Sequence, residues 1–547
     1  MAGARARRLR KSRFVYAVLG VLVAVSITSW MTYGPKRSLP RRVTPIGTMV
    51  ARPNIVFILA DDLSENLVPY MPHVLAMQRH GATFTNYFAT DSLCCPSRTS
   101  ILTGLLPHNS GVFTNTPPDG GFGTFVRLGN TARTWAVAMQ QTGYRTALMG
   151  KYLNGYVPSF DAAGRRYIPR GWDEWDVTGN GYFEYRYALN QNRKLVNYGS
   201  TPHSYLTDVL SRLGSTFVSR SGDTARLPAS GSSASGSGGP RKPFVLEIAT
   251  FAPHSPYVFA PRDARRFRTV QAPRTPAFDQ SDTVGNPRWL KQPPLTDEEI
   301  HKIDSAFRWR ARSVQAIDRM IGRIQKEVAD AGLADNTYFV FSSDNGYHMG
   351  EHRLGPGKMT AFDTDIRIPL VIEGPGIRPG MKISALAENI DLAPTFEQMA
   401  GAVPPASIDG RSLIPLLEGR TPPAWRHAVL VEHHGPDLNV NDPDFPEPGS
   451  GDPPSYSAMR LDDAVYVEYV DGEREYYDIA PDPDELRNIY GELSAARHAT
   501  LHAQLHALEQ CHGRASCHVA DRLGSAPALI PRRDRARTKL ARGRPAP

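Results

Sequence analysis

The body of this chain lacks the basic excess that the chain as a whole carries. The 547 residues have a net charge of +9, but residues 1–13 and residues 531–547 each contribute +6, which leaves −3 for residues 14–530. A mildly acidic body argues against nucleic acid as a partner. Internal repeats are also absent, which excludes an architecture built from repeated units. The length suits one large domain followed by a smaller one.

Cysteine is scarce, with four residues in the whole chain. Two of them, Cys511 and Cys517, have a spacing that suits a small disulfide loop outside the cell. A metal pair formed with His512 and His518 is the alternative. Because no second group of metal ligands lies nearby, the disulfide is favoured.

Charge is missing from residues 14–33, an uncharged and largely apolar run of 20 that is long enough to cross a membrane. The basic residues 1–13 before it predict a cytoplasmic N-terminal tail and a body on the other side of the membrane. A cleaved signal peptide is the alternative, but no small-x-small cleavage site ends the run, which favours a signal-anchor. The protein is therefore expected to be exported, and either anchored by this segment or secreted if it is cleaved.

Changes in composition predict where the other parts of the chain begin and end. Residues 219–242 are rich in serine and glycine and predict a flexible surface insertion, because an apolar strand pattern resumes at Phe244. The remaining boundaries predict a linker, a large domain, a smaller C-terminal subdomain and a disordered basic tail, over residues 34–50, 51–415, 416–525 and 526–547.

Short apolar runs alternate with helical patterns through the large domain. The first run, residues 54–60, ends at Asp61 and Asp62 and suits a strand buried on both faces of a parallel sheet. Comparable runs follow at residues 146–149, 244–250, 338–342 and 370–373. An apolar helical stripe lies at residues 307–328. The pattern predicts a doubly wound α/β fold, in which ligands collect at the carboxyl ends of the strands.

The C-terminal subdomain shows a different pattern. Residues 429–432 and 464–469 predict antiparallel strands, and residues 495–509 have helical character. These elements predict a small antiparallel sheet covered by a helix.

Residues 94–104 carry the most specific motif in the chain. They read Cys-Cys-Pro-Ser-Arg-Thr-Ser-Ile-Leu-Thr-Gly, which fits the pattern C-x-P-S-R-x-x-x-L-T-G. This segment resembles the signature of type I sulfatases in every fixed position, and the resemblance extends from Pro53 to about Tyr490. It implies the alkaline-phosphatase-like α/β fold, with a mostly parallel sheet and a smaller antiparallel subdomain. A structural cysteine pair or a chance match is the alternative.

In that family a maturation enzyme oxidises the first cysteine of the signature to formylglycine, so the resemblance nominates Cys94 rather than Cys95. The hydrated aldehyde carries two hydroxyls on one carbon. One hydroxyl attacks sulfur, and the other, once deprotonated, releases sulfate by breaking the C–O bond. This covalent route divides one difficult hydrolysis into two easier steps.

Polar residues follow two of the predicted strands. Asp61 and Asp62 close the first strand, and Asp344 and Asn345 close a later one. Alone, each pair could cap a helix or lie in a solvated turn. Together they offer three carboxylates and an amide oxygen, which suit a hard cation, Ca²⁺ or Mg²⁺. The resemblance makes this the metal site, with Ca²⁺ expected beside Cys94, where the cation would bind a sulfate oxygen and offset charge in the transition state.

The resemblance implies four further active-site residues, namely Arg98, Lys151, His254 and Lys358. If a helix begins near Pro96, Arg98 lies in its first turn and can bond the aldehyde hydrate or the carboxylates. The two lysines match the family's sulfate-binding lysines, and a protonated His254 would act as general acid to the leaving alcohol. A surface ion pair, a solvated lysine or a structural histidine is the ordinary alternative for these residues.

Residues 150–154, Gly-Lys-Tyr-Leu-Asn, depart from the commonest family pattern, because Leu153 stands where many members have a histidine. This form resembles the N-acetylglucosamine-6-sulfatase branch and its extracellular endosulfatase relatives. The group that deprotonates the sulfated intermediate is therefore left open. Asn154 could take part, but an amide cannot act as a base.

Two pairs of histidines lie outside this set. His348 and His352 have a spacing that could suit zinc, although a loop that shapes access to the site is favoured. His433 and His434 could contact the substrate. The sequence thus predicts a sulfuric ester hydrolase for a sulfated carbohydrate such as 6-sulfated N-acetylglucosamine. The alternatives are a phosphonate or phosphate ester hydrolase of the same superfold and a catalytically silent protein that binds sulfated glycans.

Overall fold

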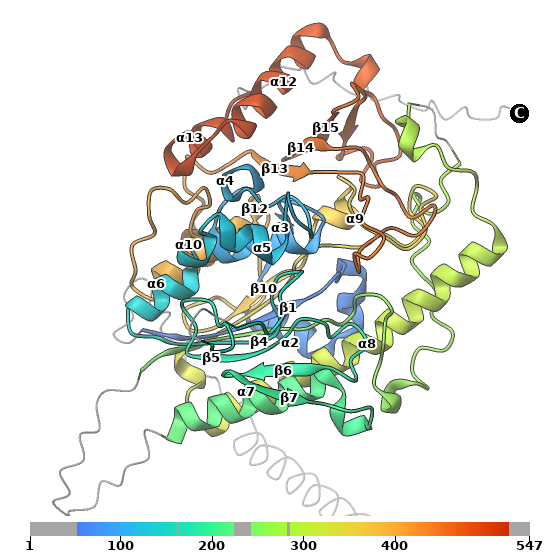
Figure 1. Ribbon diagram of the computed structural model, residues 1–547. Helices are drawn as coiled ribbons and strands as arrows, with labels where there is room; N and C mark the ends of the chain where they lie inside the picture. The colour runs from blue at the N-terminus through green and yellow to red at the C-terminus, as the bar shows by residue number, and fades with distance from the viewer. Residues whose placement is uncertain (1–51, 161–163, 224–241, 282–284, 525–547) are drawn as a thin grey trace, which may run out of the picture. The chain divides into compact units, whose positions relative to one another are not determined.

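The structure is a computed structural model, and it describes residues 52–160, 164–223, 242–281 and 285–524 (Figure 1). The predicted cytoplasmic tail, membrane segment, linker and basic C-terminal tail lie outside these residues, as does most of the serine- and glycine-rich insertion. Among the helices within the described ranges, none combines the length and the apolar character that crossing a bilayer requires.

A ten-stranded mixed sheet forms the centre of the large domain. Across the sheet the strands follow in the order β11 (Met381–Ile383), β2 (Ala82–Phe84), β10 (Leu370–Glu373), β9 (Thr337–Ser343), β1 (Asn54–Ala60), β8 (Phe244–Ala249), β4 (Arg145–Lys151), β5 (Glu174–Thr178), β6 (Ala188–Gln191) and β7 (Lys194–Asn197). The five central strands, from β9 to β5, are parallel to one another. Their carboxyl ends therefore meet at one edge of the sheet.

The predicted strands are confirmed, and the reason for their continuous apolar character is visible in β1. Phe57 lies in the hydrophobic core on one face of the sheet and Ile58 in the core on the other face. Both faces are covered, so successive residues are all buried. The run at residues 370–373 is β10, which is antiparallel to β9 rather than parallel. An interior strand is buried on both faces in either direction, so its composition does not specify the direction.

Helices cover both faces of this sheet (Figure 1). One face is covered by α2 (Pro72–His80), α7 (Leu206–Asp223) and α8 (Asp297–Asp330), and the last of these contains the predicted helix at residues 307–328. The other face is covered by α3 (Cys94–Thr103), α5 (Gly121–Arg127), α6 (Trp135–Gln141) and α10 (Leu392–Met399). Shorter helices are α4 (Pro107–Ser110), α9 (Asp363–Ile366) and α11 (Ile414–Leu417). The doubly wound prediction is confirmed.

The C-terminal region forms a separate four-stranded antiparallel sheet, as predicted. Its strands are β13 (Ala428–His433), β14 (Tyr456–Leu461), β15 (Ala464–Tyr469) and β16 (Arg474–Asp478). One face packs against α12 (Ala495–Glu509) and α13 (Gly513–Ala520), and the other packs against the large domain. A two-stranded pair, β3 (Tyr87–Phe88) and β12 (Ala387–Glu388), lies in the large domain.

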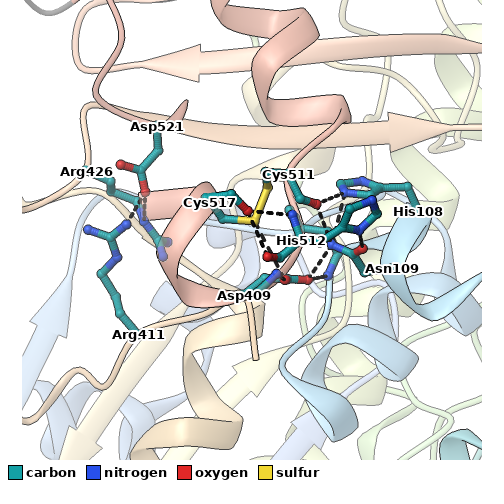
Figure 2. The surroundings of a disulfide bond; sticks show 12 residues. His108, Asn109, Asp409, Arg411, Arg426, Cys511, His512, Cys517 and Asp521 are labelled. Atoms are coloured by element: carbon teal, nitrogen blue, oxygen red, sulfur yellow. Dashed lines mark hydrogen bonds and ion pairs between the residues drawn. A yellow bond between two sulfur atoms is a disulfide. The ribbon is translucent and has the colours of Figure 1, made fainter. Parts of the chain in front are cut away.

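The predicted disulfide joins Cys511, in the turn between α12 and α13, to Cys517 within α13 (Figure 2). Its loop is held against the segment that follows α3, because the Cys511 carbonyl accepts hydrogen bonds from His108 at 2.8 Å and from Asn109 at 2.9 Å. The Gly513 amide donates to the Asp409 carboxylate at 2.7 Å. The loop therefore connects the end of the subdomain to the large domain.

Candidate active site

Two carboxylate-bearing strand ends meet because β1 and β9 are parallel neighbours, with Ala60 opposite Ser343. Asp61 and Asp62 follow β1, and Asp344 and Asn345 follow β9. The Asp62 amide donates to Asp344 Oδ1 at 3.1 Å, and Asn345 Nδ2 donates to Asp62 Oδ1 at 2.7 Å. All four side chains are buried. Asp62 has a φ of 60°, a left-handed conformation that is uncommon for a residue with a side chain and occurs preferentially at functional sites.

Cys94 is the first residue of α3 and lies against these carboxylates. Its Sγ is 3.1 Å from Asp61 Oδ1 and 3.0 Å from Lys358 Nζ. The helix begins at Cys94 rather than near Pro96, so Arg98 is one full turn further on and shares a face with Cys94. Arg98 Nε donates to Asp344 Oδ2 at 2.7 Å. Cys95 lies in the apolar core instead, which agrees with the choice of Cys94.

Two lysines approach position 94 from different parts of the chain. Lys151, at the end of β4, places Nζ 2.7 Å from Asp61 Oδ2. Gly150 precedes it with a φ of 101°, and a Cβ there would lie 1.9 Å from the Ala249 carbonyl oxygen, so only glycine fits. Lys358 Nζ lies 2.6 Å from Asp62 Oδ1. Both lysines are almost completely buried.

His254 follows β8 and faces the same centre. Its Nδ1 donates to the Ser255 carbonyl at 2.6 Å, which leaves Nε2 directed at two carboxylates. Nε2 bonds Asp444 Oδ1 and lies 3.6 Å from Asp62 Oδ2. The Tyr182 ring packs over the imidazole, with centroids 4.6 Å apart. Although burial lowers the pKa of His254, the carboxylates Asp62 and Asp444 outweigh it and raise the pKa above its ordinary value.

Burial and neighbouring charges shift the other titratable groups in opposite directions. Burial raises the pKa of Asp61 to about 6, although Lys151 opposes the shift. Burial also acts on Asp344, but the positive charges of Arg98, Lys151 and Lys358 together outweigh it and lower the pKa of that carboxyl to about 2. Burial raises the pKa of the Cys94 thiol well above its ordinary value. An unmodified Cys94 would therefore stay protonated and be a poor nucleophile.

The donor set fits a hard cation. Asn345 Oδ1 is buried and accepts no hydrogen bond within the described part of the chain, so its lone pairs are free for a metal ion. One ligand atom from each of Asp61, Asp62, Cys94 and His254 lies within 4.8 Å of the others. The oxygen atoms of Asp61, Asp62 and Asn345 are the ligand type that Ca²⁺ and Mg²⁺ prefer. The predicted ligand Asp344 is adjacent, with Oδ2 bonded to Arg98 and Oδ1 accepting from the Asp62 amide.

A cavity of about 680 Å³ opens beside this centre. Asp62, His254 and Lys358 form part of its wall, together with the loops at residues 355–359 and 443–450. This volume suits a small ligand such as a sugar ring. The cavity therefore gives a substrate access to the buried charges.

The predicted histidine pairs do not join the centre. His348 bonds Asp365 at 2.9 Å and the Ser450 carbonyl at 2.8 Å, and therefore supports one of the loops that line the cavity. His352 stacks on Phe362 with centroids 3.8 Å apart. Since the two rings bond different partners, they do not form a zinc pair.

The second pair lies outside the cavity wall. His433 bonds Asp91 at 3.3 Å, and His434 bonds Asp119 while its ring stacks on Phe113. Neither histidine is among the residues that line the 680 Å³ cavity.

Asp444 is the main residue that sequence reasoning missed. Besides bonding His254, its Oδ1 lies 2.7 Å from Lys358 Nζ. Its Oδ2 accepts from Asn115 Nδ2 at 2.6 Å and from Asn154 Nδ2 at 3.5 Å. Burial raises the pKa of this carboxyl, but Lys358 and His254 outweigh it and hold the pKa well below the usual range. Asp444 is in a proline-rich loop without periodicity, so no sequence pattern identifies it.

The structure also clarifies the departure at residues 150–154. Leu153 is buried in the apolar core, so its position cannot present a base to the site. Asn154 instead contacts the site through Asp444. Asn115 links the same carboxylate to α3, because its Oδ1 accepts from the Cys95 amide at 2.9 Å.

Comparisons with known proteins agree with this arrangement. The chain matches the family model described as Sulfatase over residues 53–402 and the one described as N-sulphoglucosamine sulphohydrolase, C-terminal, over residues 350–511. N-acetylglucosamine-6-sulfatase of Homo sapiens is 33% identical over 490 residues, which cover 84% of this chain and 85% of that protein.

Solved structures share the fold. A protein in complex with its substrate D-glucosamine-2-N,6-O-disulfate has a TM-score of 0.67 and 24% identity, covering 87% of this chain and 100% of that one. The phosphonate monoester hydrolase of Agrobacterium radiobacter has a TM-score of 0.62 and 20% identity, covering 84% of this chain and 96% of that one. At these identities the likeness concerns the fold alone, and it confirms the predicted architecture.

Proposed function

The chain belongs to the sulfatase family and is a sulfuric ester hydrolase, and we propose that it hydrolyses sulfate esters of sugars, with 6-sulfated N-acetylglucosamine as the first candidate. One observation carries the proposal. The first signature cysteine, Cys94, lies at the start of a helix within 3.1 Å of both a carboxylate and a lysine, beside a cavity of about 680 Å³. The human relative, an N-acetylglucosamine-6-sulfatase, supports the choice of sugar.

Formylglycine formed from Cys94 would supply the nucleophile in place of a thiol whose pKa is raised by burial. The side chains around it have separate roles in this proposal. Lys151 and Lys358 provide fixed positive charge on either side of position 94 for the sulfate oxygens. Arg98 holds Asp344 in place from the same helix face.

His254 acts as the general acid in this proposal. The raised pKa favours the protonated form of His254, and the hydrogen bond from Nδ1 to Ser255 fixes the orientation of the ring. His254 lines the cavity that would admit the substrate, and in this proposal it delivers the proton of Nε2 to the leaving alcohol. Asp444 orients His254 and Lys358 together, because one carboxylate oxygen bonds both.

A divalent cation, which we propose to be Ca²⁺, would be held by Asp61, Asp62, Asp344 and Asn345 together with residue 94, and would supply positive charge for the sulfate oxygens when bound. The free oxygen of Asn345 and the oxygen-rich donor set support this choice over a softer metal.

The alternative of a phosphonate or phosphate ester hydrolase keeps the same fold, as the Agrobacterium radiobacter neighbour illustrates. Matched aryl sulfate, phosphate and phosphonate esters separate the two. The proposal expects sulfate release to be the fastest of the three reactions. Faster phosphate or phosphonate release would transfer the assignment to the alternative.

The decisive experiment combines a mass measurement with an activity assay, on protein from its native host. The peptide containing Cys94 is expected to have the mass of the aldehyde or its hydrate, and the enzyme is expected to release sulfate from N-acetylglucosamine 6-sulfate. An intact cysteine together with no sulfate release would favour a catalytically silent protein that binds sulfated glycans.

We further propose that the catalytic body is exported, where the maturation enzyme and a sulfated glycan would be its partners. The disulfide between Cys511 and Cys517 supports an oxidising compartment. The anchor at residues 14–33 stays a prediction from the sequence. Fractionation of the native host decides it: an anchored enzyme sediments with membranes until detergent is added, whereas a secreted one stays in the medium.

A further inference from the structure

A second cavity, of about 1050 Å³, lies on the surface of the large domain. We call it the aromatic groove and define it by Tyr156, Val157, Phe183, Tyr185, Arg186 and Tyr187. Phe183 is 64% exposed and Val157 60% exposed, so two large apolar side chains face solvent at one place. Exposed apolar groups gathered in this way mark a surface that contacts another molecule.

The groove carries positive charge and no opposing charge. Arg166 and Arg186 line it, and none of its lining residues is an aspartate or a glutamate. Arg186 is exposed, and its guanidinium makes no ion pair or hydrogen bond with the residues that the structure describes. Glu184, its neighbour in sequence, is buried and accepts a hydrogen bond from the Thr207 amide at 2.8 Å, so it does not neutralise the groove.

The aromatic side chains are held in fixed orientations. Tyr187 donates from its hydroxyl to the Ser204 carbonyl at 3.0 Å and stacks on Tyr198 with centroids 5.0 Å apart. Tyr185 packs edge-on against Tyr205, and its buried hydroxyl has no hydrogen-bond partner in the described part of the chain. Fixed aromatic faces suit a ligand with apolar ring faces, such as a sugar.

The groove and the active site are neighbours along two segments of the chain, although no residue lines both cavities. Asn154 directs its side chain to Asp444 in the site, whereas the next two residues, Gly155 and Tyr156, line the groove. Tyr182 packs on His254, whereas the next residue, Phe183, lines the groove. In each segment the residue that contacts the site directly precedes one that lines the groove, so the groove lies next to the site.

We propose that the aromatic groove binds a sulfated oligosaccharide chain beyond the sugar unit that is desulfated. The inference rests on the proposed function for its substrate class. Aromatic rings pack against the apolar faces of sugar rings, and a guanidinium forms paired hydrogen bonds with the oxygens of an oxyanion such as sulfate. The absence of acidic lining residues removes the repulsion that a polyanion would otherwise meet.

Binding of a heparin-derived hexasaccharide to full-length Cys94→Ala protein tests the proposal without turnover. Arg186→Ala and Phe183→Ala are each expected to raise the Kd for the hexasaccharide about tenfold, since each removes one charged or stacking contact. Both variants are expected to leave the Kd for N-acetylglucosamine 6-sulfate unchanged. Matched controls are Arg323→Ala and Trp309→Ala, which remove an exposed arginine and an exposed aromatic from α8.

Three outcomes would overturn the inference. The first is an unchanged hexasaccharide Kd in both groove variants. The second is an equal loss for the monosaccharide, which would mean that the variants disturb the active site. The third is equally tight binding of an uncharged hexasaccharide, which would make the groove an apolar surface without preference for sulfate. Thermal melting of each variant checks the fold, and Arg186→Glu, which reverses the charge, is expected to weaken hexasaccharide binding more than Arg186→Ala.

Turnover separates this inference from the proposed function. If the otherwise unmodified enzyme releases no sulfate from any sugar ester while hexasaccharide binding still depends on Arg186, the proposed function fails and the groove stands. If sulfate is released from both the monosaccharide and the hexasaccharide, and Arg186→Ala changes the KM for neither, the function stands and the groove fails.

Discussion

Two clusters of buried charged side chains differ in how their cations are paired. The active-site cluster uses Lys151 and Lys358, whose ammonium groups contact carboxylates beside an open cavity. The second cluster, which we call the closed cluster, consists of Glu388, Asp391, Arg411, Arg426 and Asp521. Arg426 bonds Asp391 through two hydrogen bonds of 2.7 Å each, and Arg411 bonds Asp521 (Figure 2).

The difference shows that burial of charge does not by itself indicate catalysis. A guanidinium that bonds a carboxylate through two nitrogens has a fixed geometry. Arg426 is bonded in this way to Asp391, and the pair joins the C-terminal subdomain to the large domain. A lysine is a compact charge that can be shared with an incoming sulfate. Residues 391 and 411 of the closed cluster are also joined through the backbone, because the Arg411 amide donates to the Asp391 carboxylate at 2.8 Å.

The largest expected effect comes from the nucleophile position. Cys94→Ala is expected to lower kcat by about 10⁴-fold or more, because it removes the group that forms the covalent intermediate. Cys95→Ala is the matched control and is expected to keep most of the activity, since Cys95 lies in the apolar core. Sulfate release from N-acetylglucosamine 6-sulfate measures both. Equal losses in the two variants would contradict the choice of Cys94.

Removal of the cation is expected to have the next largest effect. Dialysis against a chelator is expected to lower kcat/KM on the order of 10³-fold, because the charge that stabilises the sulfate oxygens is lost. Addition of Ca²⁺ is expected to restore activity, and Asn345→Ala is expected to raise the Ca²⁺ concentration needed for half-maximal recovery. Full activity in protein shown by elemental analysis to be metal-free would refute the site.

A pair of substitutions tests the comparison of the two clusters directly. Lys358→Ala is expected to lower kcat/KM about 10²- to 10³-fold, because it removes a charge beside position 94. Its loss of stability is expected to be smaller than that of Arg426→Ala, because Asn345 and Asn115 still donate hydrogen bonds to the carboxylates Asp62 and Asp444. Arg426→Ala is expected to lower the free energy of unfolding by about 3–5 kcal/mol, because it leaves the Asp391 carboxylate buried and unpaired.

Both variants are compared by urea unfolding and by kinetics at a temperature where each remains folded. The reverse result, in which Lys358→Ala mainly destabilises the fold and Arg426→Ala mainly impairs catalysis, would contradict the distinction between the clusters.

The smallest expected effect concerns the disulfide beside the closed cluster. Replacing Cys511 and Cys517 by serine opens a short loop, and the free energy of unfolding is expected to fall by about 2 kcal/mol. Activity at low temperature is expected to stay unchanged, since the loop contacts the segment after α3 rather than the site itself. A large loss of kcat in the folded variant would show that the loop positions Cys94.

Much of the fold was predictable because buried strands consist of apolar residues, which can be recognised in the sequence. The continuous apolar run of β1 is explained by a sheet that is covered on both faces. The polar residues after β1 and β9 could be expected to meet, because parallel neighbouring strands end at the same edge of the sheet. The direction of β10 was not predictable, because an interior strand is equally apolar in either direction.

The site was predictable only where local motifs carry the chemistry. The signature at residues 94–104 and the strand-end pairs are short and specific, and the structure brings them together. Asp444 has no such local sign. Its loop contacts His254 and Lys358, which are 190 and 86 positions away in the sequence, and no period or motif connects these segments.

The sequence by itself determined the family and the disulfide, because each depends on residue types at fixed short spacings, and for the same reason it nominated Cys94 and the strand-end carboxylates. Only the tertiary structure decided which charges face the cavity and which are locked into ion pairs. It also decided that Asp444 bridges His254 and Lys358, and that aromatic and arginine side chains gather in one groove. These features depend on contacts between segments that are distant in the sequence, and such contacts form only when the chain is folded.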